Sequence, residues 1–130
     1  MAMPVSVSKP IVGVDVAKNE LVIYQAELDL LETLPNNKPA IKKWLKALPA
    51  PVDVAIESTN IYHLEFADLA HDAGCTIYMV GGYELSHYRK GVNVRAKTDA
   101  LDAKLLARYL KNEYDELHPW VPPSPLYRRL

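Results

Sequence analysis

The sequence contains very little cysteine and no long hydrophobic run. Cys75 is the one cysteine among 130 residues, so the chain cannot close an internal disulfide or build a zinc site from paired cysteines. The longest apolar runs, at 11–14 and 77–80, are far shorter than the roughly 20 residues of a membrane-spanning helix. Residues 1–10 lack the apolar stretch of a secretory signal. These absences favour a protein of the cytoplasm that does not enter a membrane.

The remaining composition is that of an ordinary globular domain. Hydrophobic residues make up 49% of the chain and charged residues 24%, which excludes an intrinsically disordered or collagen-like protein. A chain of 130 residues suits a single domain, and such a domain buries roughly two-thirds of its unfolded surface. We therefore expect a hydrophobic core that needs no disulfide or structural metal.

The net charge of −1 conceals an asymmetry along the chain. Residues 1–84 contain six lysines and arginines and eleven acids, a balance of −5, whereas residues 85–112 contain seven lysines and arginines and two aspartates, a balance of +5. A basic segment inside a nearly neutral protein is a candidate surface for a polyanion such as nucleic acid. The alternative is a solvated helix face with no partner.

The spacing of apolar residues predicts an α/β domain in which strands and helices alternate after three initial strands. Turn residues and prolines separate the segments. Gly13 lies inside the first strand, where another part of the backbone is expected to approach closely. The polar run 58–60 is expected to cap the second helix, and Gly74 to end it. Strands are predicted at 9–16, 20–28, 30–34, 52–56 and 75–80, and helices at 41–48, after 60, around 83–88 (short) and at 99–112.

This β-β-β-α-β-α-β-α order predicts a mixed five-stranded sheet with helices on both faces. The turn between the first two strands is too short for a crossover helix, so these strands should pair antiparallel. Asp15 lies near the end of the first strand and Glu57 at the end of the fourth. Ligands of open α/β sheets gather at such strand ends, although either acid alone could be a harmless strand-end residue.

Two further acids lie at the start of the last predicted helix. On a helical wheel its apolar stripe spans about 40° to 180° from Leu101, and Asp102 and Asp99 fall inside it, near 100° and 160°. The basic residues Lys104 and Arg108 fall on the opposite side. Asp99 could simply cap the helix and Asp102 could favour its dipole. However, acids on a core-facing stripe are costly without a cation, and no arginine or lysine shares that stripe, so we expect a bound metal ion.

Four carboxylates in one place select a hard cation, Mg²⁺ or Mn²⁺. Such clusters typically perform two-metal phosphoryl transfer. The neighbouring basic segment favours the same substrate, a nucleic-acid backbone. Arg95 and Lys97, just before the helical acids, are the best candidates for phosphate contacts, and Lys111 is expected on a solvated outer face.

Three strings in the sequence resemble the DEDD motif set of the Piv-like insertion-sequence transposases and invertases. They are GVDVAK (13–18), AIESTNIYH (55–63) and the most specific one, AKTDALDAKLLARY (96–109). The resemblance runs from about residue 10 to the end of the chain. Proteins of this family have an N-terminal domain similar to the RuvC Holliday-junction resolvase, within the ribonuclease H-like superfold.

The resemblance implies a catalytic and metal-binding tetrad and a set of residues that contact DNA. It also implies Mg²⁺ or Mn²⁺ as the cofactor and transposition or site-specific recombination as the activity. The tetrad would be Asp15, Glu57, Asp99 and Asp102. The nucleic-acid contacts would be Arg89, Lys90, Arg95, Lys97 and Thr98.

The resemblance further implies three segments: a disordered leader (1–9), the RuvC-like catalytic domain (10–117) and a proline-rich linker that begins a following helix (118–130). Family members continue into a C-terminal domain with a serine implicated as nucleophile, which this chain does not contain. A guide RNA is a further partner implied by the family. The whole protein is expected to be a homo-oligomer, and this chain a monomer or weak dimer.

Three other functions fit parts of the pattern. A RuvC-like structure-specific nuclease would use the same acids, and a non-catalytic nucleic-acid-binding module would keep the fold without the chemistry. An actin-like sugar kinase or ATPase also begins with a strand and an aspartate, but it requires glycine and threonine after that aspartate, where this chain has Val16 and Ala17. A nucleotide-binding assay would distinguish the last class.

Overall fold

Strand β1 (Ile11–Val16) lies at the centre of a five-stranded sheet with the order β3-β2-β1-β4-β5. The computed structural model describes residues 9–58, 61–91 and 99–122 and, for Asp99 and Ala100, the backbone alone. β1 pairs antiparallel with β2, and β2 with β3, while β4 and β5 run parallel to β1. The other strands are β2 (Glu20–Gln25), β3 (Leu30–Pro35), β4 (Asp53–Glu57) and β5 (Thr76–Val80). The predicted mixed α/β fold is confirmed.

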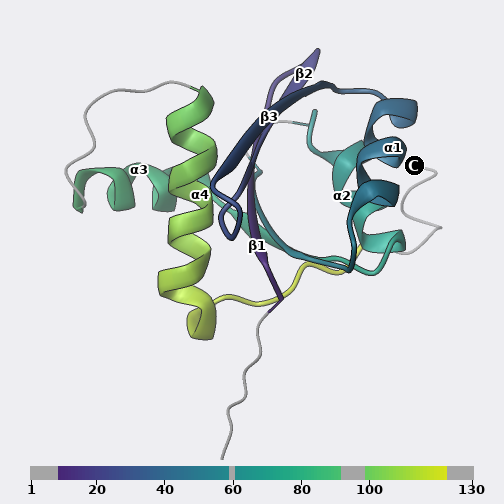
Figure 1. Cartoon of the computed structure of the whole chain (residues 1–130). Helices are drawn as coiled ribbons and strands as arrows, with labels where there is room; N and C mark the ends of the chain where they lie inside the picture. Colours follow the sequence, from purple (N-terminus) through teal and green to yellow (C-terminus); the bar gives the residue numbers. More distant parts are fainter. Residues whose placement is uncertain (1–8, 59–60, 92–98, 123–130) are drawn as a thin grey trace, which may run out of the picture.

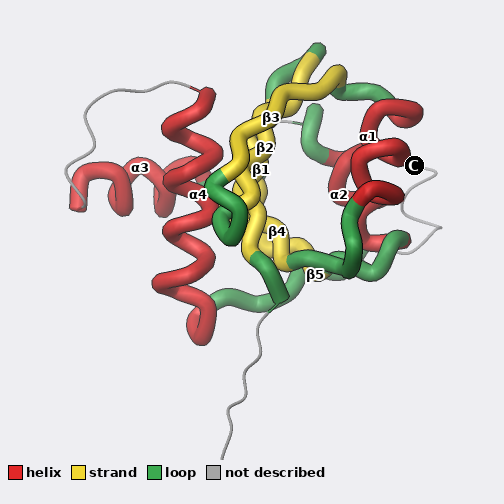
Figure 2. The backbone as a smooth tube through the Cα atoms, in the orientation of Figure 1, coloured by secondary structure: helices red, strands yellow, loops and turns green. Residues whose placement is uncertain are grey.

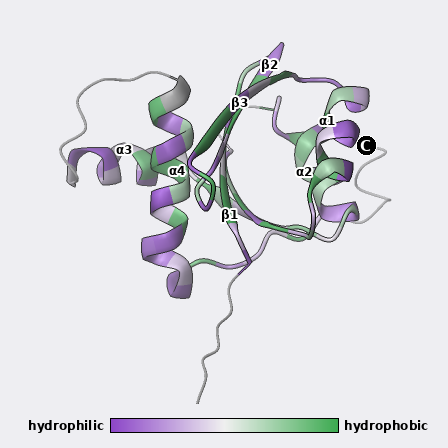
Figure 3. Ribbon diagram, in the orientation of Figure 1, coloured by the Kyte–Doolittle hydropathy of each residue, from purple (hydrophilic) through white to green (hydrophobic). Residues whose placement is uncertain are grey.

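Helices cover both faces of this sheet, as Figures 1 and 2 show. One face carries α1 (Lys38–Ala47) and α2 (Leu64–Asp72). The other carries α4 (Asp99–Glu113), with α3 (Gly82–Gly91) packed against it. Along both helix layers hydrophobic and hydrophilic residues alternate, as amphipathic helices require (Figure 3). Among the described helices, none has the length and apolar character that crossing a membrane would demand.

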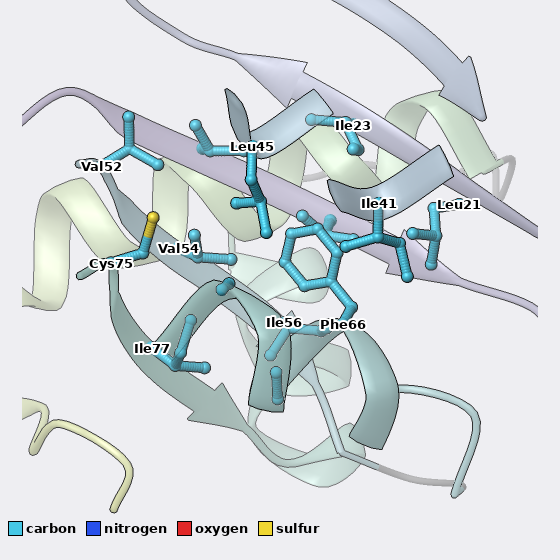
Figure 4. Packing of buried hydrophobic residues seen from close by; sticks show 14 of the residues in the cluster. Leu21, Ile23, Ile41, Leu45, Val52, Val54, Ile56, Phe66, Cys75 and Ile77 are labelled. Carbon is cyan, nitrogen blue, oxygen red and sulfur yellow. The ribbon is translucent and has the colours of Figure 1, made fainter. Parts of the chain in front are cut away.

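The face under α1 and α2 is filled by large apolar side chains. Phe66 of α2 is completely buried and lies close to Ile41 of α1 and Ile56 of β4 (Figure 4). Trp44 closes the same cluster, with its ring 5.9 Å from that of Phe66. The helix α1 that carries Ile41 begins at Lys38, three residues earlier than predicted, because the Asn37 side chain caps it by accepting a hydrogen bond from the Ala40 amide at 2.9 Å. This face supplies the larger of the two hydrophobic clusters.

The face under α4 has small residues at the point where the helix crosses β1, so that helix and strand lie very close together there. A Cβ atom at Gly13 would clash with the carbonyl oxygen of Ala103 and lie 2.7 Å from the amide nitrogen of Ala107. Gly13 therefore allows helix and strand backbones to touch, which confirms the predicted close approach at this position. The contact fixes the height and lengthwise position of α4 above β1.

Several boundaries differ from the sequence prediction. The second strand ends at Gln25 instead of 28, because residues 26–29 form the hairpin turn and Asp29 adopts a positive φ of 49°. The predicted cap of α2 by residues 58–60 is wrong: α2 begins at Leu64, after a turn, and its N-cap is His63. The predicted end is correct, since Gly74 follows the helix with φ +94°.

The residues after α4 cross the edge of the sheet. A short 3₁₀ helix, η1 (Tyr114–Glu116), follows α4, and the chain then reaches β5, where the Trp120 amide donates to the carbonyl of Ile77 at 2.6 Å. The Trp120 ring packs against the large cluster and meets the ring of His71 edge-on at 6.0 Å. The predicted linker is thus docked on the domain through residue 120, where it covers the exposed edge of β5.

Candidate active site

Asp15 and Glu57 lie side by side at the carboxyl ends of two neighbouring parallel strands. Val14 of β1 is paired with Ile56 of β4, one residue before each acid. Side chains alternate along a strand, so both acids share the face of Gly13 and Ala55, which is the face under α4. Both acids are half-buried. The predicted position at adjacent strand ends is confirmed.

Helix α4 presents Asp102 to the same face. The residue is only 4% exposed, while Lys104, Arg108 and Lys111 are exposed on the other side of the helix. Both placements agree with the helical wheel. Asp99 is the first residue of α4, and its side chain lies outside the described residues.

The negative charge of Asp102 meets the cation of Arg89, a residue that the sequence predicts only as a nucleic-acid contact. The guanidinium of Arg89, on α3, forms an ion pair and hydrogen bond with a carboxylate oxygen of Asp102. No arginine or lysine of α4 shares the stripe of Asp102, as predicted, but a protein cation still reaches this acid from a different helix, 13 residues earlier in the chain. The buried charge of Asp102 therefore does not by itself require a metal ion.

Helix α3 is held against α4 by a short apolar stripe with helical spacing. Leu85 is buried, and the Tyr88 ring meets that of Tyr109 edge-on at 5.0 Å. The Tyr88 hydroxyl accepts a hydrogen bond from the side-chain amide of Asn112 at 2.5 Å. Since Arg89 follows Tyr88 directly, this packing determines where its guanidinium lies.

The described carboxylates have the chemistry of a hard-cation site, but Asp15, Glu57 and Asp102 do not form the expected cluster of ligands. No three acids, histidines or cysteines with described side chains lie close enough together to hold a metal ion. Asp15, Glu57 and Asp102 nevertheless offer oxygen ligands from one face, and Asp102 already has a cation against it. An all-oxygen set of this kind fits Mg²⁺ or Mn²⁺ better than zinc.

Exposed basic side chains lie on α3 and on the outer face of α4. Lys90 is exposed beside Arg89, and the Lys104 ammonium lies 5.5 Å from the centre of the Tyr24 ring of β2. Arg95, Lys97 and Thr98, the other predicted nucleic-acid contacts, lie outside the described residues. Lys104, Arg108 and Lys111 therefore form a basic outer face on α4. Their role in nucleic-acid binding stays a prediction.

A second polar cluster lies at the opposite end of β4 and was not predicted. Asp53 is almost completely buried and has a raised pKa, because loss of solvent outweighs the opposing effects of Lys9 and of a hydrogen bond with Tyr114. Within the described part of the chain, its Oδ2 atom accepts no hydrogen bond. Burial and hydrogen bonding to Tyr114 also raise the pKa of Tyr78. The β4 sequence predicts a strand at this position, but nothing in it indicates that the Asp53 side chain is buried.

Comparison with known structures places the fold in the RuvC class. The structure of Thermus thermophilus RuvC superposes with a TM-score of 0.60, covering 85% of this chain and 99% of that one. T. thermophilus RuvC in complex with a Holliday junction substrate gives 0.59, covering 86% and 99%. Sequence identity is 12% in both cases, so the likeness concerns the fold.

The sequence comparison is more specific. The model of the IS110-type DEDD transposases, a family described as transposase, matches residues 12–130, and the chain belongs to this family. The pilin gene-inverting proteins of Moraxella bovis and Moraxella lacunata are each 30% identical over 125 residues. That alignment covers 90% of this chain but 38% of either relative. The predicted family is confirmed.

Proposed function

We propose that this chain is the catalytic domain of a DNA transposase or site-specific recombinase that performs divalent-metal-dependent phosphoryl transfer. The observation that carries the proposal is the placement of Asp15 and Glu57 at neighbouring strand ends, under the helix that buries Asp102 on the same face. Membership of the DEDD transposase family supports the assignment of these acids and of Asp99 as the tetrad.

In this proposal each acid has a defined task. Asp15 and Glu57 hold their carboxylates at a fixed spacing because adjacent strands lie about 4.8 Å apart. Asp102, and Asp99 one turn before it, approach from the helix side and complete the oxygen set. Bound Mg²⁺ or Mn²⁺ would polarise the scissile phosphate and lower the pKa of an attacking water. Because α4 is seated directly on Gly13, its acids keep a constant distance from the strand ends.

DNA is the proposed substrate. The relatives are named for gene inversion, and one RuvC structure holds a Holliday junction. In this chain, exposed Lys90 on α3 and Lys104 and Arg108 on the outer face of α4 provide positive charge on the two helices that carry Arg89 and Asp102, which suits salt-sensitive binding to phosphates without sequence preference. A cytoplasmic location, a guide RNA and self-association of the whole protein belong to the same proposal.

The test is cleavage of labelled four-way junction DNA by the purified chain in Mg²⁺ or Mn²⁺. We expect metal-dependent nicking that Asp102→Asn lowers by at least about 100-fold, because loss of a charge-stabilising ligand costs roughly 3 kcal/mol in the transition state. Asp72→Asn is the matched control: it makes the same chemical change on α2, on the other face of the sheet, where the side chain is 77% exposed.

Three outcomes would contradict the proposal or part of it. Nicking that survives Asp102→Asn would exclude this site. Salt-sensitive DNA binding without nicking, unaffected by Asp102→Asn, would favour the non-catalytic binding module. Efficient rejoined products from this chain alone would exclude the predicted need for a serine nucleophile in a further domain.

A further inference from the structure

The ion pair between Arg89 and Asp102 is an unusual feature of a site that is expected to bind metal. Both side chains are largely buried, with exposed fractions of 16% for Arg89 and 6% for Asp102. The guanidinium contacts a carboxylate oxygen, which is the kind of atom that a divalent cation would need from this residue. Arginine stays protonated at any physiological pH, so it can leave that oxygen only by moving away.

In this ion pair, the Arg89 guanidinium takes the place that a metal ion would have next to the Asp102 carboxylate. It places one positive charge against an acid that is otherwise expensive to bury. A divalent cation at Asp102 would repel the guanidinium and compete for the same oxygen. In the described part of the chain, the buried Nε atom of Arg89 makes no hydrogen bond, so the guanidinium is held here with part of its donor capacity unused.

We propose that Arg89 is an internal counter-ion that occupies the cation position at Asp102 and is displaced when metal binds. This inference rests on the proposed function, since it takes Asp102 as a metal ligand. The displaced guanidinium would lie beside the bound metal, and its planar pair of donors suits a phosphate oxygen of the DNA backbone. Arg89 would thus stabilise the metal-free domain and, after metal binding, contact the substrate.

If metal has to displace Arg89, then Arg89 lowers the metal affinity of the site. A residue that only supports the site would raise that affinity. A supporting residue would orient Asp102, and its removal would lower metal affinity. Removal of a competitor raises metal affinity, and at the same time it destabilises the metal-free protein by leaving a buried carboxylate without its cation. The two roles therefore predict shifts of opposite sign.

The experiment is titration of the 130-residue chain with Mn²⁺, followed by calorimetry and by the Mn²⁺ electron paramagnetic resonance signal. We expect Arg89→Gln to bind Mn²⁺ roughly tenfold more tightly than the wild type, which corresponds to about 1.4 kcal/mol. We also expect the melting temperature of its metal-free form to fall and its metal-induced rise to be larger. Lys43→Gln removes the same charge from an exposed position on α1, on the other face of the sheet, and should leave Mn²⁺ affinity within about twofold.

Arg89→Lys covers the case in which Arg89→Gln does not fold. It keeps the charge but loses the planar fork, so Mn²⁺ affinity should rise by less than in Arg89→Gln. Unchanged or weaker Mn²⁺ binding in both variants would overturn the proposal. Asp15→Asn in the otherwise wild-type chain tests the metal site separately from the role of Arg89. If this variant binds Mn²⁺ as tightly as the wild type, the proposed metal site is wrong. If it binds Mn²⁺ more weakly, while the Arg89 variants have no effect, only the counter-ion role fails.

Discussion

The two faces of the sheet are packed differently, although the same five strands form both of them. Under α1 and α2, large side chains such as Phe66 and Trp44 fill the space between helix and sheet. Under α4, the backbone of β1 at Gly13 touches the backbone of the helix at Ala103 and Ala107. Asp102 is buried on the same side of that helix. Both faces bury apolar side chains, and the larger cluster lies under α1 and α2; only the second face adds a contact between two backbones, which fixes the position of α4.

This difference indicates where the protein tolerates change. A core of large side chains can relax around a substitution, because neighbouring side chains shift and share the strain. Contact between two backbones has no such freedom. We therefore expect the two faces to respond differently to single substitutions, in both stability and metal binding.

The largest effect is expected for Gly13→Ala. The new Cβ would clash with the Ala103 carbonyl, and since neither backbone can yield locally, α4 must move. We expect a loss of about 3 kcal/mol in the free energy of unfolding and a loss of Mn²⁺ affinity in the folded fraction, measured by urea denaturation and calorimetric titration. If the Mn²⁺ affinity is unchanged, the contact between α4 and Gly13 does not determine the position of Asp102.

A smaller effect is expected for Phe66→Leu on the opposite face. The substitution removes part of a fully buried ring but leaves a branched apolar side chain to refill the space. We expect a cost of about 1–2 kcal/mol by urea denaturation, with Mn²⁺ affinity unchanged. A change in affinity comparable to that of Gly13→Ala would abolish the distinction between the two faces.

The smallest effect, and one of opposite sign, is expected for Asp53→Asn. Burial raises the pKa of Asp53, so between the ordinary and the raised value the folded chain binds more protons than the unfolded chain, and stability falls as pH rises through that window. The neutral amide removes this cost, and we expect a gain of about 1 kcal/mol at neutral pH. Denaturation repeated below the ordinary aspartate pKa of about 3.9 should show no gain; a gain independent of pH would exclude the charge as its cause.

Most elements could be predicted because their signals are local. The β-branched run that predicts β1, the apolar stripe that predicts α4 and the prolines that bound α1 are each patterns among residues close together in the sequence. The wrong predictions are local too: the partly apolar residues 26–28 predict strand but belong to the hairpin turn, and the polar run 58–60 predicts a cap for α2, whose N-cap position is His63, without a side-chain capping hydrogen bond.

The sequence by itself determined the order of the elements and the side of each on which its acids lie, because strand and helix periodicities are properties of neighbouring residues. It therefore placed Asp15 and Glu57 at strand ends and Asp102 on the buried stripe. Only the tertiary structure decided which groups meet those acids. The pairing of Arg89 with Asp102, like the docking of Trp120 at the edge of β5, depends on how separate elements pack against one another. Periodicity specifies which face of a helix is buried, but not which neighbour covers it.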